Sequence, residues 1–231
     1  MSEFLSASSF FAVALTLAVW RGARALQKKT GSQLLHPILV SVGVIILVLL
    51  AAGIPNSAYQ ERMKPFSWLM TPATICLAVP LYEQVKVLKK NLGAIFLGAL
   101  CGTLTSLICV GGLCLLFRLD KTLTVSLLPK SVTTAIGAPV SKALGGLESV
   151  TVAVIIATGI LGSVCGQAAC RLFRIQDPIA QGTAIGTASH VIGTTRANEM
   201  GALQGAVSSL SLVIAGLLTA FLVPALAQIL P

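Results

Sequence analysis

Long apolar stretches alternate with short polar ones along this chain, which is the pattern of a protein that crosses a membrane repeatedly. A spanning helix needs roughly 20 apolar residues with about 1.5 Å of rise each. The stretches predicted to span on this basis are residues 4–20, 37–54, 92–117, 150–170 and 205–230. The expected fold class is all-α, a polytopic helical membrane protein with about 6–8 membrane segments.

Three further apolar stretches carry helix-breaking or small polar residues. Residues 66–85 contain Pro72 and Pro80, while residues 123–145 and 179–197 are rich in Gly, Ser, Thr and Ala. Irregular backbone at membrane depth is tolerated only where it is buried in protein or lines a water-filled cavity. We therefore expect residues 123–145 and 179–197 to form two broken or re-entrant helices.

The composition supports this interpretation. Hydrophobic residues make up 55% of the 231 residues and charged residues only 10%, whereas soluble domains carry about a quarter charged residues. No long polar stretch remains for an aqueous domain, so residues 1–231 are expected to form a single membrane domain. The net charge of +9 lies in short clusters, without a basic face or interleaved aromatic residues, which argues against nucleic-acid binding.

Three basic clusters indicate the orientation, because Lys and Arg concentrate on the cytoplasmic side of a membrane. The clusters are Arg21, Arg24, Lys28 and Lys29, then Lys86, Lys89 and Lys90, and finally Arg171 and Arg174. With all three in the cytoplasm, residues 123–145 begin and end outside, as a re-entrant hairpin or a pair of half-helices. Residues 179–197 form either a second re-entrant element or a full broken span, which leaves the side of the C-terminus open.

The first apolar stretch resembles a secretory signal in length, but its charges have the opposite order. Glu3 precedes the stretch and the first basic cluster follows it. We therefore expect an uncleaved first helix whose N-terminus lies outside.

An internal repeat is one further interpretation of the chain. A broken segment near Thr71 precedes the long span that starts at Leu92, and Thr183 stands in the same relation to Gly205. Small-residue breaks in corresponding places are typical of transporters built from repeats with discontinuous helices.

The first broken segment has the features of an anion site. Pro129 followed by hydroxyl residues is a helix-start signal, and the start of a half-helix offers unpaired N–H groups to an anion. Lys130 adds a positive charge beside Ser131, Thr133 and Thr134. The alternative is structural: Lys130 extends to the membrane interface, and the hydroxyl groups allow neighbouring helices to approach or bond.

The second broken segment carries ionisable residues in an otherwise apolar region. It contains Ser189, His190, Thr194 and Arg196, and ionisable groups at membrane depth are costly and usually functional. His190 lines a substrate or proton path, or is a hydrogen-bonded core residue. Arg196 holds a carboxylate bidentately, or is an interfacial residue paired with Glu199.

We hypothesise that Lys130, Ser131, Thr133 and Thr134 meet Ser189, His190, Thr194 and Arg196 around one central cavity that binds a small anion. Catalysis has little support, since there is no nucleophile elbow, zinc-protease motif, P-loop or paired carboxylate. The six cysteines lie in apolar segments without a Cys-x-x-Cys pair, so neither a metal site nor a cofactor is expected.

Two long motifs in the chain resemble those of the LrgB/CidB family. They are Leu127-Leu128-Pro129-Lys130-Ser131-Val132-Thr133-Thr134 and Gly186-Thr187-Ala188-Ser189-His190-x-x-Gly193-Thr194-x-Arg196-Ala197. Supporting matches are His36-Pro37-Ile38-Leu39-Val40 and the run from Pro72-Ala73-Thr74 to Pro80-Leu81-Tyr82. His36 replaces the usual Asn of the family, and Ala135 replaces a common Pro.

The resemblance implies two functions in a bacterial inner membrane. One is transport of small carboxylates such as glycolate, glycerate or pyruvate, for which we predict alternating access. The other is holin- or antiholin-like modulation of murein hydrolase activity and cell lysis, together with an LrgA/CidA-type membrane partner. A homo-oligomer, as a dimer, is also expected. Two broken, cation-bearing segments suit a small-anion site better than a pore, so we favour the transporter.

Overall fold

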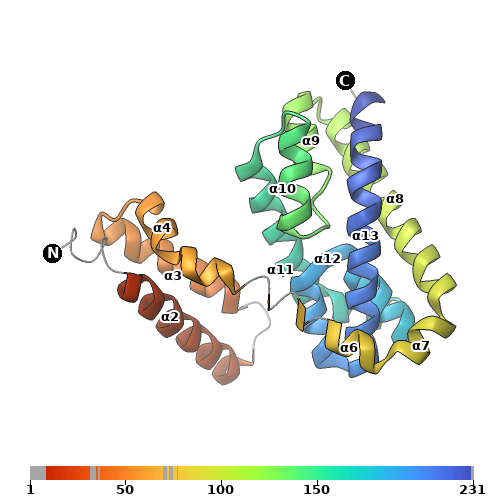
Figure 1. Ribbon diagram of the computed structural model, residues 1–231, viewed down its shortest axis with the longest axis horizontal. Coiled ribbons are helices and arrows are strands. Elements are labelled where there is room, and N and C mark those ends of the chain that lie inside the picture. Colours follow the sequence, from red (N-terminus) through yellow and green to blue (C-terminus); the bar gives the residue numbers. More distant parts are fainter. Residues whose placement is uncertain are drawn as a thin grey trace. The chain divides into compact units, whose positions relative to one another are not determined.

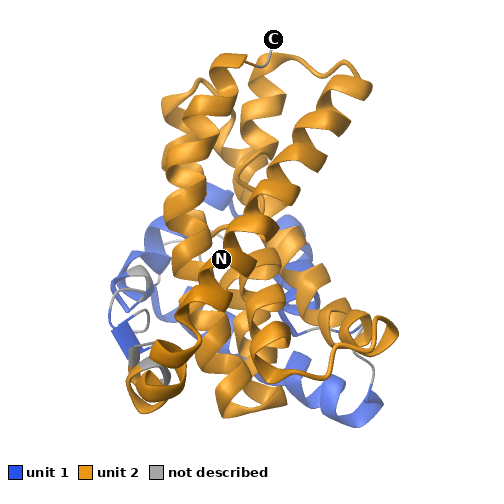
Figure 2. Ribbon diagram, turned by 90° about the vertical axis from the view of Figure 1, so that its right-hand side faces the viewer, with its two compact units in different colours: residues 1–77 blue, residues 78–231 orange. Residues whose placement is uncertain are grey.

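The computed structural model of the chain describes residues 9–31, 35, 37–69, 72, 75–76 and 78–229. The chain divides into two compact units, Met1–Leu77 and Ala78–Pro231, which Figure 2 shows in different colours. All regular secondary structure of the described residues is helical, which confirms the all-α prediction.

The described part of the N-terminal unit contains α2 (Ser9–Thr30), α3 (Pro37–Ala52) and α4 (Asn56–Trp68). α2 packs against both other helices, and it continues through the basic cluster that was expected to follow the first span. α3 and the first part of α4 are bent by 118° relative to each other, as in a broken span or a re-entrant loop. Residues 4–8 of the predicted first span, and His36, lie outside the described residues.

The C-terminal unit holds both broken segments. Its helices in the described residues are α6 (Ala78–Glu83), α7 (Val85–Lys90), α8 (Leu92–Leu116), α9 (Lys121–Leu127), α10 (Thr134–Ala143), α11 (Glu148–Leu172), α12 (Pro178–Met200) and α13 (Ala202–Ile229). α2, α8, α11 and α13 are long and apolar enough to cross a membrane, and the bent α3–α4 pair is a fifth candidate by length and composition. The prediction of a polytopic helical membrane protein is therefore confirmed.

The predicted segment 66–85 is divided rather than continuous. Its described residues belong to the end of α4, to α6, and to short stretches between them. Thr71 and the Ala73-Thr74 pair lie outside the described residues. The proposed internal repeat depends on that stretch, so it stays a prediction.

α8 and α13 run in the same direction through the C-terminal unit (Figure 1). Near their first residues Ile95 packs with Val207, and further along both helices Leu107 shares a hydrophobic cluster with Val223. α11 returns from the end where α8 finishes to the end where α13 begins. The three long helices therefore form the frame that holds the two broken segments.

α9 and α10 form a hairpin of two short helices at the end of the unit where α8 finishes (Figure 1). In the turn between them, Leu128 is buried in the cluster of Leu107 and Val223. At the exit of the hairpin, the backbone N–H of Leu147 donates to Oγ of Ser126 at 2.7 Å. The chain thus enters and leaves at one end, as predicted for residues 123–145.

α12 is a second hairpin, because the chain reverses at His190, where φ is 42° and ψ is −143°. Positions that face each other along α12 and α13 are Gly182 with Gln204, Gly186 with Ser208, Thr194 with Ser208, and Asn198 with Gly205. The first half of α12 therefore runs alongside α13, and the second half runs back towards the start of α13.

This arrangement decides between the two alternatives left open for residues 179–197. The segment enters and leaves at the same end of the unit, so it is re-entrant and not a full span. That end carries the basic clusters around Lys86 and Arg171, which the positive-inside rule places in the cytoplasm. Because α13 starts there and runs parallel to α8, the C-terminus is expected on the outer side.

Glycines allow the α12 hairpin to fit between its neighbours. A Cβ atom at Gly186 would lie 2.8 Å from Cα of Ser208 on α13, and one at Gly159 of α11 would lie 2.6 Å from Cε1 of His190. In a membrane the hydrophobic effect does not favour helix association, because lipid is as apolar as the helix surfaces. Helices there associate through small residues that let their backbones approach closely. The backbone of α12 thus lies against the backbone of α13, and its His190 ring lies against the backbone of α11.

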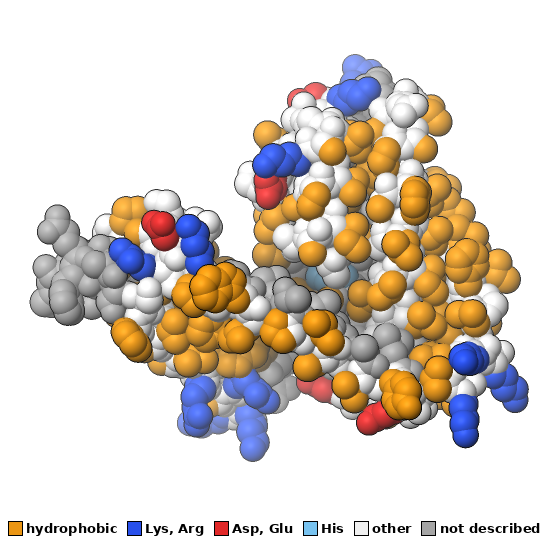
Figure 3. Space-filling model, viewed as in Figure 1, with side chains coloured by type: hydrophobic (Ala, Val, Ile, Leu, Met, Phe, Trp, Pro, Cys, Tyr) orange, Lys and Arg blue, Asp and Glu red, His pale blue; other side chains and the backbone are white. Residues whose placement is uncertain are grey.

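The surface of the C-terminal unit has the distribution expected in lipid (Figure 3). Large apolar side chains such as Ile108, Leu116, Leu217 and Phe221 are exposed along α8 and α13. Lys and Arg side chains gather towards the ends of the unit and leave the middle of this face apolar. A water-soluble protein rarely exposes so large an apolar area.

Replacing Gly186 with Ala tests the close approach of α12 to α13. The added methyl group meets the Ser208 backbone, which cannot move without shifting α13, so we expect a loss of about 1–3 kcal/mol of stability. The measurement is the temperature at which the detergent-solubilised protein loses its monodisperse peak.

Gly112→Ala on α8 is the matched control, because no heavy atom lies within 4 Å of the added Cβ. It should leave the transition unchanged or raise it slightly, since Ala favours helix over Gly. Equal transitions for the two variants would contradict the packing described here.

Candidate functional site

The two hairpins meet at Ile155 of α11, which is completely buried. Its backbone carbonyl accepts a hydrogen bond from Nε2–H of His190 at 2.9 Å. Its Cδ1 atom lies 2.6 Å from the position that a Cβ atom would take at Gly137 of α10. One residue of α11 therefore contacts both broken segments, which come from opposite ends of the unit.

Lys130 and Ser131 lie at the tip of the first hairpin. Nζ of Lys130 donates to Oγ of Ser131 at 3.0 Å, and that oxygen lies 3.1 Å from Oγ of Ser106 on α8. Ser106 is near the middle of α8, a 25-residue helix about 37 Å long. The only described lysine on either hairpin tip is thus placed near mid-depth, beside two hydroxyl groups.

A cavity of about 730 Å³ runs between α8 and the first half of α12. From α8 it extends over positions between Ala94 and Leu113, and Lys130 and Ser131 reach into it. Its polar lining is completed by Thr105, Ser106, Asp177, Thr183 and Thr187. We call it the α8–α12 cavity.

A second cavity, of about 630 Å³, lies on the other side of the same half-helix, against α11. Lys130 and Ser189 line it, together with Thr158 of α11. The rest of its lining is mostly apolar and includes Leu161, Cys165, Phe173 and Ile185. We call it the α11–α12 cavity. Lys130 therefore borders both spaces that flank the first half of α12.

A third space, of about 10 Å³, is enclosed between the two hairpins. Hydroxyl-bearing residues dominate its polar lining, which comprises Thr103, Ser106, Ser131, Thr187 and Thr219. It is about large enough for one water molecule. Because Ser131 and Thr187 both line it, the tip of the first hairpin lies next to the first half of α12.

His190 is a core residue in this structure, with 4% of its surface exposed. Its positive φ is unfavourable for a residue with a side chain, and such strain persists only where the surroundings fix it. The ring reaches the α11 backbone because position 159 is glycine. The structure thus matches the second of the two roles considered for His190, that of a hydrogen-bonded core residue.

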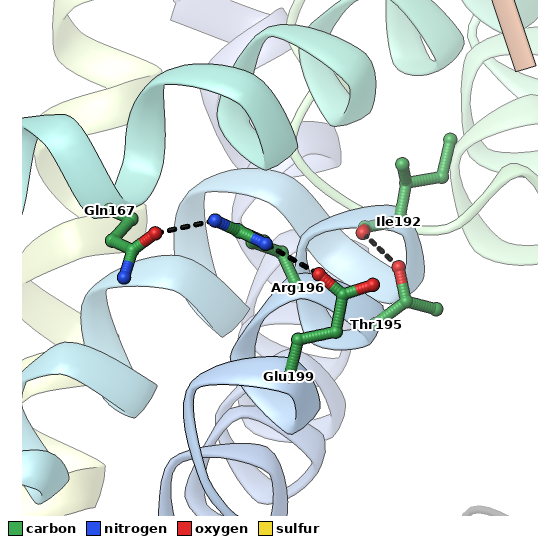
Figure 4. A network of polar contacts seen from close by, with 5 residues as sticks. All are labelled: Gln167, Ile192, Thr195, Arg196 and Glu199. Atoms are coloured by element: carbon green, nitrogen blue, oxygen red, sulfur yellow. Dashed lines mark hydrogen bonds and ion pairs between the residues drawn. The ribbon is translucent and has the colours of Figure 1, made fainter. Parts of the chain in front are cut away.

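Thr194 and Arg196 fix the returning half of α12. The fully buried Thr194 hydroxyl donates to the carbonyl oxygen of His190 at 2.9 Å and lies 2.8 Å from Oγ of Ser208. The guanidinium group of Arg196 bonds Glu199 and Gln167 (Figure 4). The Glu199 pair is the structural alternative considered for Arg196.

The structure brings together part of the predicted site. Lys130, Ser131 and Ser189 line the cavities described above, whereas His190, Thr194 and Arg196 do not appear among the residues that line them. Thr133 and Thr134 begin α10 and are partly buried. They too are absent from those linings.

Several lining residues had no signal in the sequence. Thr103 and Ser106 lie in the middle of a regular apolar helix, where isolated hydroxyl groups are ordinary. Thr187 belongs to the motif that contains His190 and Arg196, whose ionisable side chains are the stronger signal. Thr187 does have a signal, because Thr183 and Thr187 are one helical turn apart and face Gly98 and Gly102 of α8. That pairing of two helices could have been found from the small-residue pattern.

A lysine ammonium and several hydroxyl donors converge near mid-depth. Among the described residues, no three His, Cys, Asp or Glu side chains come together as a metal site would require.

Known proteins are similar to this chain in sequence over nearly its whole length. Residues 16–229 match the LrgB-like family. The chain is 35% identical over 229 residues to a "Holin-like protein CidB" of Staphylococcus epidermidis, with 98% of each chain covered. It is 35% identical over 226 residues to the protein of that name in Staphylococcus aureus, again with 98% of each chain covered.

A further relative has no assigned role. The "Uncharacterized protein YwbG" of Bacillus subtilis is 34% identical over 205 residues, which cover 89% of this chain and 91% of that protein. No solved structure matches the chain.

Thr194→Val tests the role of the buried hydroxyl group that joins the returning half of α12 to α13. The substitution leaves Oγ of Ser208 without this partner, so we expect a loss of about 1–3 kcal/mol of stability. Thermal unfolding in detergent, followed by the loss of helical circular dichroism, gives the measurement, since most of the helical residues belong to the C-terminal unit.

The neighbouring Thr195→Val variant is the control, because the Thr195 side chain is exposed and bonds only locally, to the carbonyl of Ile192 (Figure 4). Its unfolding temperature should stay close to that of the unmodified chain. A larger loss in Thr195→Val than in Thr194→Val would refute the assignment.

Proposed function

The chain belongs to the LrgB-like family, and on that premise we propose that it is a membrane carrier of small carboxylate anions. The proposed substrates are hydroxy- or oxo-acids of two or three carbon atoms, such as glycolate, glycerate and pyruvate. The proposed activity is transport and involves no catalytic step.

The observation that carries the proposal is the position of Lys130. A cation at membrane depth is costly, so it is retained where it has a partner or a task. In the described contacts of Lys130, the ammonium group bonds the neutral hydroxyl of Ser131 rather than a carboxylate. A substrate carboxylate would supply the missing negative charge, and the hydroxyl groups of Ser106 and Ser131 would donate to it.

The two hairpins suit a carrier that exposes one site to each side in turn. They enter from opposite ends of the unit and meet near mid-depth, which is where carriers with discontinuous helices bind substrate. Movement of one hairpin relative to the long helices would open the site to one side at a time. We therefore propose alternating access, in which Lys130 and Ser131, at the tip of the first hairpin, move relative to α8.

A second candidate is a holin-like role in membrane permeability and cell lysis. The observation in its favour is the name of the staphylococcal relatives, holin-like protein CidB, which supports this role more directly than it supports a carrier. In this case the chain would act with an LrgA/CidA-type membrane protein, and as a homo-oligomer. The two candidate functions are compatible if transport of the carboxylate by this chain influences cell lysis.

Uptake into proteoliposomes separates the candidates and tests Lys130. Purified protein should accumulate labelled pyruvate or glycolate, with and without an LrgA/CidA-type partner, while the vesicles retain sucrose. Lys130→Gln removes the charge but keeps a polar side chain, and we expect at least a tenfold lower uptake.

Lys142→Gln is the matched control, because the Lys142 side chain is 74% exposed and pairs with Glu148 at the end of the first hairpin. Its uptake should equal that of the unmodified chain. Release of sucrose would favour the holin-like role. Uptake by Lys130→Gln equal to that of the unmodified chain would show that Lys130 does not bind the substrate.

A further inference from the structure

The two cavities beside the first half of α12 differ in chemistry. The residues that line the α8–α12 cavity include five with a side-chain hydroxyl group, namely Thr105, Ser106, Ser131, Thr183 and Thr187. Apart from Lys130, the polar lining of the α11–α12 cavity is limited to Thr158 and Ser189. Both are large enough for a small acid, so their volumes do not distinguish them.

Of the residues that line these two cavities, those with a fully buried hydroxyl oxygen and no hydrogen-bond partner belong to only one of them. Within the described residues, Oγ1 of Thr183 and Oγ1 of Thr187 are buried and make no hydrogen bond, and both residues line the α8–α12 cavity. The two residues are 8% and 5% exposed. A buried hydroxyl group without a partner costs about 1–3 kcal/mol, so two of them one turn apart require an explanation.

Their methyl groups explain the orientation of these side chains but not the missing partners. Cγ2 of Thr183 packs at Gly98 and Cγ2 of Thr187 packs at Gly102, where Cβ atoms would approach to 2.9 and 2.8 Å. Valine would make the same contacts without an unpaired hydroxyl group. The packing of α8 against α12 therefore does not account for threonine at either position.

The enclosed space of about 10 Å³ adjoins the α8–α12 cavity, because Ser106, Ser131 and Thr187 line both. Oγ1 of Thr103 is also buried without a hydrogen-bond partner, and Thr103 lines this space together with Ser131 and Thr187. Hydroxyl groups on α8, on the tip of the first hairpin and on α12 thus surround one position next to Lys130.

We propose that Thr183 and Thr187 bind the carboxylate, or the neighbouring oxygen atom, of a small acid in the α8–α12 cavity, beside Lys130 and Ser131. The inference rests on the proposed carrier function and assigns its substrate to one of the two cavities. Hydroxyl groups donate to a carboxylate and also accept from a 2-hydroxyl group, so the site takes both hydroxy- and oxo-acids. Asp177, at one end of this cavity, accepts from the backbone N–H of Ala180, and its charge is directed to the start of α12.

Substitutions of Thr187 separate binding from packing. Thr187→Val keeps the methyl contact with Gly102 and loses the hydroxyl group, whereas Thr187→Ser keeps the hydroxyl group and loses the methyl group. In proteoliposomes, we expect Thr187→Val to raise KM for pyruvate or glycolate roughly tenfold with a smaller change in maximal rate, and Thr187→Ser to stay near the unmodified value. Thr158→Val, in the α11–α12 cavity, is the control and should leave KM unchanged.

Native cysteines report which cavity holds the acid without measuring transport. Cys109 lines the α8–α12 cavity and Cys165 lines the α11–α12 cavity, and both are exposed. Two variants, each keeping one of these cysteines and carrying Ala at the other five, are treated with a charged, water-soluble methanethiosulfonate. Saturating pyruvate should slow labelling of Cys109 and leave labelling of Cys165 unchanged.

The outcomes separate this inference from the carrier function. If uptake depends on Lys130 but pyruvate protects Cys165 alone, or Thr187→Val keeps its KM, the carrier function stands and the assignment to the α8–α12 cavity is wrong. If neither cysteine is protected and no acid is accumulated, the carrier function itself fails. A raised KM in Thr187→Ser but not in Thr187→Val would assign Thr187 to packing.

Discussion

The C-terminal unit depends on satisfying the backbone of α12 where it reverses inside an apolar bundle. Lipid offers no hydrogen bonds, so polar groups released at a helix break must find partners within the protein. Thr194 meets this requirement by donating to the carbonyl oxygen of His190, and the His190 ring donates to the carbonyl oxygen of Ile155. The second bond needs close approach of α12 to α11, which Gly159 provides, while Gly186 lets the first half of α12 approach α13.

The position of the candidate site follows from this reversal. A hairpin that stops at mid-depth leaves room for a second hairpin from the opposite end, and both contact α11 at Ile155. The tip of the first hairpin then places Lys130 beside the first half of α12, between two cavities. The residues that make the reversal possible therefore also determine where Lys130 lies. The strained backbone of His190 lies at this junction. A movement of either hairpin would therefore change the contacts that hold His190 in this conformation.

The sequence predicted most of the framework and part of the site. Apolar length predicted α8, α11 and α13, because a span has a minimum length that composition alone reveals. Charge placement predicted the first hairpin but could not choose for the second, since no charged loop separates its halves. The motifs pointed to His190 and Arg196, yet their side chains are engaged by Ile155, Gln167 and Glu199. Nothing local predicted Thr103 and Ser106 as lining residues, because their positions in the site arise from contacts between distant helices.

The two broken segments meet in the middle of the unit, next to Ser131 and Thr187. Cross-linking of Ser131→Cys with Thr187→Cys, in a chain whose native cysteines are replaced by Ala, measures this contact. Both positions line the same enclosed space of about 10 Å³, so a disulfide or a short bifunctional reagent should join them in membranes. Ser131→Cys with Ala202→Cys, at the start of α13, should not be joined. Joining of this second pair, or of neither pair, would contradict the account.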